Sequence, residues 1–190
     1  MSILSYGPMS KGIIYAAYHE AGHVLALLLT NKRFKYVTIV PENMKDGYGI
    51  ETSGHVRGIP SEIKNQWEIP SFFKPVKFNR YFKNDFIKVA GLVTEQIYTG
   101  KNNKTGAGGD FEEWINVTLL GLPNKLSSKY QKFLLDYTKE VLELKINWLH
   151  ITAIAEALGE RETLSYAQVI DVFMQSSKMW RESKPESVRV

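Results

Sequence analysis

Apolar residues recur at helical spacing near the start of the chain. Over Lys11–Thr30 they fall three or four residues apart, which predicts a helix with a buried face. Ser10 is a candidate N-cap for this helix, and Asn31 is a candidate end. The next segment, 34-FKYVTIVP-41, alternates and is rich in β-branched residues, so it predicts a strand, and 50-IETSGHV-56 predicts its partner strand.

The rest of the chain reads as mainly helical. The segment 57–75 shows no periodicity and predicts a loop. Helical spacing then predicts a helix over 76–98 that ends at Gly100, and a short helix over 110–120. It also predicts one long helix from Ser127 or Ser128 to Leu158 that stops at Gly159, and a last helix over about 165–180. We therefore expect a mainly α (α+β) fold with a small β-sheet near the N-terminal third. Residues 1–180 are expected to form one domain, and 181–190 a polar, disordered tail.

The composition is that of a globular protein and excludes several kinds of chemistry. The 190 residues are 44% hydrophobic and 23% charged, with a net charge of +4 and no cysteine. Disulfides, thiolate metal sites and cysteine nucleophiles are therefore excluded. The positive charges are scattered rather than clustered, so no nucleic-acid partner is expected. There is no secretory signal pattern, and titratable residues interrupt the apolar run 13–30, so we expect a cytoplasmic protein without a membrane span.

The segment 19-HEAGH-23 places three titratable side chains inside the apolar first helix. Residues four apart lie on one face of a helix, so His19 and His23 can hold one metal ion. Glu20 is offset around the helix, where it suits a general base that takes a proton from activated water. Burying these groups costs free energy, and so does Gly22 in the helix interior. The pattern indicates a zinc site with another segment packed very close to the helix at Gly22.

The third zinc ligand is not identified by spacing alone. A catalytic zinc ion usually takes three protein ligands, and position 29, six residues after the second histidine, is Leu rather than His. Two other histidines and four carboxylates, which flank the loop 101-KNNKTGAGGD-110, are the candidates: His55, His150, Glu95, Asp110, Glu112 and Glu113. Asp110 and Glu113 also fit a capping box at a helix start, which needs no metal.

Several blocks of the sequence resemble the peptidase domain of the FtsH family of zinc metallopeptidases. The run 16-AAYHEAGHVLALLL-29, followed by 36-YVTIVP-41, is similar to the family's H-E-A-G-H helix and the strand after it. Three later blocks resemble family segments in the same order, and together the likeness covers most of residues 10–175: 90-AGLVTEQIYTG-100, 105-TGAGGDFEEW-114 and 155-AEALGERETLSYAQV-169.

The resemblance implies roles for individual residues. His19 and His23 match the zinc-binding histidines, Glu20 the general base, and Asp110 the third zinc ligand. Glu95 would then orient a histidine rather than bind the metal. The implied fold is a helical peptidase domain whose small sheet holds a substrate strand at its edge. Gly109 departs from the family, which has asparagine before the ligand aspartate.

Two functions follow from these patterns. The first is a zinc metalloendopeptidase that acts on peptides or flexible protein segments. It would be ATP-independent, because the sequence contains no G-x-x-x-x-G-K-[ST] phosphate loop of an AAA+ module. The alternative is a non-catalytic, zinc-containing binding or adaptor protein related to these peptidases. A homo-oligomer, or a partner protein that delivers the substrate, fits either function.

Overall fold

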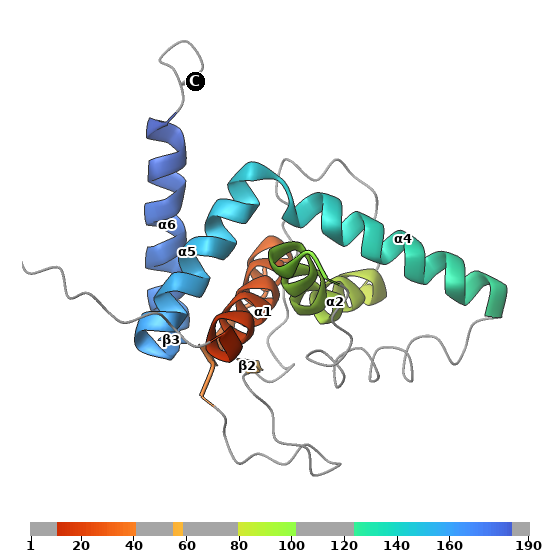
Figure 1. Cartoon of the computed structure of the whole chain (residues 1–190), viewed down its shortest axis with the longest axis horizontal. Coiled ribbons are helices and arrows are strands. Elements are labelled where there is room, and N and C mark those ends of the chain that lie inside the picture. The colour runs from red at the N-terminus through yellow and green to blue at the C-terminus, as the bar shows by residue number, and fades with distance from the viewer. Residues whose placement is uncertain (1–10, 41–54, 59–79, 102–123, 184–190) are drawn as a thin grey trace, which may run out of the picture.

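The fold is mainly helical with a small antiparallel sheet, as predicted. The computed structural model describes residues 11–40, 55–58, 80–101 and 124–183 (Figure 1). The elements of these residues, in chain order, are α1 (Lys11–Leu29), β1 (Phe34–Thr38), β2 (His55–Gly58), α2 (Arg80–Thr99), α4 (Asn124–Leu142), α5 (Lys145–Arg161), β3 (Thr163–Ser165) and α6 (Tyr166–Glu182).

Helix α1 lies at the centre of this arrangement (Figure 1). It packs against α2 and α5, while α4 packs against α2, and α6 packs against α5. The residues of α1 that are fully buried face these neighbours and form the middle of the core: Ala17, Ala21, Val24, Leu25 and Ala26. The helix is therefore apolar on more than one side because other elements cover it on more than one side.

By length and composition alone, α1 could also cross a membrane. The 18 residues Gly12–Leu29 are long and apolar enough to span a bilayer, and 56% of this segment is buried inside the structure. The core helix of a globular protein can have the same length and hydropathy, so these two properties are weak support for a span. The contacts of α1 with α2, α5 and the sheet account for its apolar surface.

The sheet has the strand order β2-β1-β3, and both pairings are antiparallel. Thr38 of β1 pairs with His55 on one side and Thr163 on the other, and the Thr38 and Thr163 hydroxyl oxygens lie 2.7 Å apart. The prediction of β1 is confirmed. The second predicted strand overlaps β2 at 55–56, its residues 50–54 lie outside the described part, and β2 continues to Gly58. Strand β3 was not predicted, because three residues are too few to show an alternating pattern.

The long helix predicted from Ser127 or Ser128 to Leu158 is wrong, because it is two helices. α4 ends at Leu142, and Leu144 has the non-helical backbone angles φ −55° and ψ 128°. The Asn147 side-chain amide donates to the Val141 carbonyl over 2.7 Å, which stabilises the turn. The break allows α4 to pack on α2 and α5 to pack on α1.

Four of the predicted helix ends can be compared with the structure. Asn31 (φ 56°) and Gly100 (φ 65°) follow α1 and α2 in the left-handed conformation, as expected for helix-ending residues. Gly159 does not stop α5, which runs to Arg161 and ends at Glu162 with φ 60°. The last helix runs to Glu182, two residues beyond the predicted domain end. The predicted cap at Ser10 and the predicted helix over 110–120 lie outside the described residues, as do residues 59–75 of the loop predicted over 57–75 and residues 184–190 of the tail predicted over 181–190. The loop prediction is wrong at 57–58, which belong to β2, and the tail prediction is wrong at 181–182, which belong to α6.

The close approach predicted at Gly22 is confirmed. A Cβ atom on Gly22 would collide with the Thr94 hydroxyl and lie 2.7 Å from the Ala90 carbonyl oxygen, both on α2. The glycine therefore lets α1 and α2 pack backbone to backbone beside the two histidines.

Candidate metal centre

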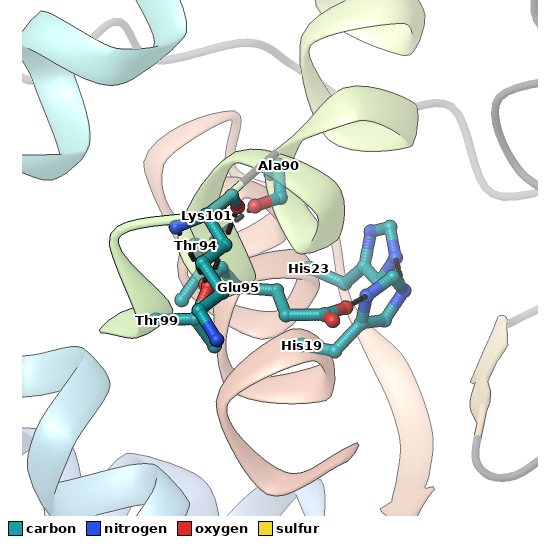
Figure 2. A network of polar contacts seen from close by, with 7 residues as sticks. All are labelled: His19, His23, Ala90, Thr94, Glu95, Thr99 and Lys101. Carbon is teal, nitrogen blue, oxygen red and sulfur yellow. Dashed lines mark hydrogen bonds and ion pairs between the residues drawn. The ribbon is translucent and has the colours of Figure 1, made fainter. Parts of the chain in front are cut away.

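The two histidines of the H-E-x-x-H pattern lie side by side on α1. The His19 and His23 rings have their centroids 4.8 Å apart, and their Nε2 atoms are separated by 3.1 Å (Figure 2). Each residue is only 9% exposed. A tetrahedral zinc ion with Zn–N bonds of about 2.0–2.1 Å would hold two nitrogens about 3.3 Å apart. The pair therefore fits a single shared ion.

The orientation of His23 is fixed from α2. Its Nδ1 atom lies 2.8 Å from the Ile87 carbonyl oxygen. A carbonyl can only accept a hydrogen bond, so Nδ1 donates. In the neutral ring the Nε2 lone pair is then directed away from Ile87, toward the neighbouring histidine, as a metal ligand requires.

Glu95 of α2 lies against the other ring nitrogen of His19. Its Oε2 atom is 3.6 Å from His19 Nδ1, and the residue is 3% exposed (Figure 2). The carboxylate thus approaches the nitrogen that does not face His23. This arrangement suits a group that orients the imidazole, and it does not suit a ligand to an ion held between the two Nε2 atoms.

Glu20 follows His19 on α1 and is 5% exposed. One residue along an α-helix corresponds to a rotation of about 100°, so Glu20 projects to one side of the line through the two histidines. A buried carboxylate in this position can exchange a proton with a small molecule bound near the pair.

The remaining predicted ligands are not brought to this pair in the described part of the chain. Within it, no group of three or more His, Cys, Asp or Glu side chains is arranged to hold a metal ion. Asp110, Glu112 and Glu113 lie outside the described residues, and of His55 the structure describes the backbone in β2 only.

His150 belongs to a different part of the core. Its Nδ1 atom lies 2.7 Å from Ser176 Oγ, so it links α5 to α6 rather than joining the histidines of α1. Burial away from water lowers the pKa of His150 to about 4. Its candidacy as a zinc ligand is therefore not supported by the structure.

Sequence reasoning missed two contributions of α2 to the centre. The Ile87 carbonyl orients His23, and Gly91 lies against both imidazoles. The position of a backbone carbonyl cannot be recognised from a residue pattern. Gly91 could have been recognised, because a glycine in the interior of a predicted helix indicates a close approach of another segment.

A comparison with known proteins found a distant similarity to a zinc metalloprotease. The chain is similar to the ATP-dependent zinc metalloprotease FtsH of Leuconostoc mesenteroides subsp. mesenteroides, with 26% identity over an alignment of 199 positions. The alignment covers 83% of this chain and 26% of that protein, so the chain spans about a quarter of the relative's length. No family model matches the chain. This distant similarity suggests relatedness to FtsH and is consistent with a zinc protease.

Proposed function

We propose that this protein is a zinc metalloendopeptidase that cleaves peptides or flexible protein segments without hydrolysing ATP. The observation that carries the proposal is the convergence of His19 Nε2 and His23 Nε2 to 3.1 Å on a buried helix that also carries Glu20. The distant similarity to a zinc metalloprotease supports it.

In this proposal the chain's own residues hold the ion and move the proton. His19 and His23 would bind Zn²⁺ through Nε2, and the FtsH resemblance supplies Asp110 as the third ligand. When bound, zinc supplies a Lewis acid that activates water and polarises the scissile carbonyl. Glu20 accepts the proton of the attacking water and passes it to the leaving amine.

The small sheet offers a place for the substrate. β2 is at one edge of the sheet among the described strands, and it also contacts α1, which carries the histidines. An extended peptide can add to such an edge through main-chain hydrogen bonds. The proposed substrate is therefore an unfolded or flexible segment, whose backbone is free to pair.

Zinc binding is expected to depend on the two histidines of α1. We expect His19→Ala and His23→Ala each to weaken Zn²⁺ binding by more than about 100-fold, because loss of groups that only orient a ligand already weakens it by about 10–100-fold. His150→Asn, which changes a histidine that lies between α5 and α6, is the matched control and should bind zinc like the unaltered protein. Competition with a chelating dye measures the affinities, and a peptide-library digest with and without chelator measures cleavage.

The outcomes separate the possible functions. Unchanged zinc affinity in both variants would refute the centre on α1. Zinc binding that needs both histidines, without any chelator-sensitive cleavage, would instead favour a zinc-containing binding or adaptor protein.

Glu95 is expected to act through His19. Glu95→Gln keeps the size of the side chain and removes its charge, so the imidazole loses an anionic partner at Nδ1. We expect zinc affinity to fall by about 10–100-fold. Glu143→Gln, which changes an exposed carboxylate near Lys139, is the control and should leave the affinity unchanged. An unchanged affinity in Glu95→Gln would show that the contact with His19 does not tune the ion.

A further inference from the structure

Gly91 of α2 directly faces the two histidines. A Cβ atom built on it would lie 2.6 Å from His19 Nε2, 2.8 Å from His19 Cδ2, and closer still to His23 Nε2. These are the three nearest heavy atoms apart from the neighbouring backbone of α2 itself, and real Cβ atoms essentially never come within 3.0 Å of such non-bonded atoms. Any side chain at 91 would therefore enter the space around both Nε2 atoms.

We infer that Gly91 is a positioning residue of the metal centre, whose missing side chain keeps the two Nε2 atoms together and open to a cation. A methyl group at this position must either push the imidazoles apart or occupy part of the ion's coordination sphere. Either result removes the shared site that a separation of 3.1 Å provides. The inference rests on the proposed function for its ion, and its steric part rests on the described contacts alone.

A second glycine of the same interface shows why this role is specific. Gly22 of α1 faces Thr94 and the backbone carbonyl of Ala90, so a Cβ there collides with α2 itself. At Gly91 the colliding atoms are the ends of two side chains, which can rotate away while the helices stay in place. Alanine at 22 should therefore disturb the packing of the helices, whereas alanine at 91 should disturb the histidines.

The first test is the zinc affinity of Gly91→Ala. We expect it to be about 10–100-fold below that of the unaltered protein, at equal helix content by circular dichroism. With Co²⁺ in place of zinc, the visible absorption of a site with two histidine ligands should be weakened or lost. Gly12→Ala is the matched control, because a Cβ at Gly12 meets nothing within 4 Å, and its affinity should not change.

The results distinguish this inference from the proposed function. If the unaltered protein and Gly91→Ala bind zinc alike while His23→Ala does not, the role of Gly91 is overturned and the metal centre stands. If the unaltered protein binds no zinc, the proposed function and this role fall together.

The second test needs no metal. In metal-free protein we expect Gly91→Ala to lower the melting temperature. In the His19→Ala/His23→Ala background, where the colliding rings are gone, it should leave the melting temperature unchanged or raise it, because alanine favours the helix over glycine. Gly22→Ala should lower it in both backgrounds. If Gly91→Ala folds only in the background without the two rings, the collision with them is confirmed. An equal loss in both backgrounds would show that Gly91 serves helix packing instead, and would overturn the inference.

Discussion

Glu20→Gln is expected to abolish peptide cleavage while leaving zinc binding intact. Glutamine has nearly the same size as glutamate, so it can occupy the buried position on α1 without disturbing the helix. It cannot accept a proton from water at neutral pH, and loss of a positioned general base typically costs about 10²–10⁴-fold in rate. The measurement is the rate of cleavage of a peptide by zinc-loaded protein, with zinc content determined on the same sample.

The control for this variant is Glu143→Gln, which removes an exposed carboxylate of the same kind and should cleave normally. Cleavage by Glu20→Gln at the unaltered rate would exclude Glu20 as the base. Loss of zinc from the same variant would mean that Glu20 is a zinc ligand rather than the general base that accepts the proton of water.

The local part of the candidate site could be predicted from the sequence. The spacing of four residues between His19 and His23, within a run of helix-forming residues, already places both imidazoles on one face. Helical periodicity is a short-range property, so it also located α1, α2 and α6 to within a few residues. The costly Gly22 correctly indicated a close neighbour, although it did not say which element that neighbour is.

The long-range part could not be predicted from spacing. His23 is oriented by a carbonyl 64 residues further along, and Thr38 meets Thr163 across 125 residues. Such contacts depend on how the helices pack, and no local pattern contains that information. The break between α4 and α5 was missed for the same reason, because helical periodicity continues across it while the packing partners change from α2 to α1.

His150 shows how chemistry can be misread when packing is unknown. As one of four histidines it was a candidate ligand. In the structure it is buried between α5 and α6. The centroid of its ring lies 4.1 Å from that of the Phe173 ring, and its Nδ1 atom lies 2.7 Å from Ser176 Oγ. Ser176 Oγ also donates to the carbonyl oxygens of Val172 and Phe173, each 3.0 Å away, so its oxygen can accept the hydrogen bond from His150 Nδ1.

This packing leads to a pH-dependent stability. Burial lowers the pKa of His150 from 6.5 to about 4, so the folded state keeps the ring neutral where the unfolded chain would already be protonated. The unfolded state therefore binds more protons between these two values. The contribution of the neutral ring to the free energy of unfolding is fully present above pH 6.5 and is lost as the pH falls toward 4. At about 1.4 kcal/mol per pKa unit, the loss is on the order of 3 kcal/mol.

His150→Asn tests this expectation, because the side-chain amide of asparagine corresponds in position to Nδ1, which bonds Ser176, and does not titrate in this range. Urea unfolding at about pH 7.5 and about pH 4.5 gives the free energy of unfolding of each protein. Between these two values the unaltered protein should lose on the order of 3 kcal/mol more than the variant. Taking the difference between the two proteins removes the contributions of the other titratable groups, which are the same in both. Equal losses would mean that the ring of His150 is protonated in the folded state as readily as in the unfolded chain, and that burial between α5 and α6 does not hold it neutral.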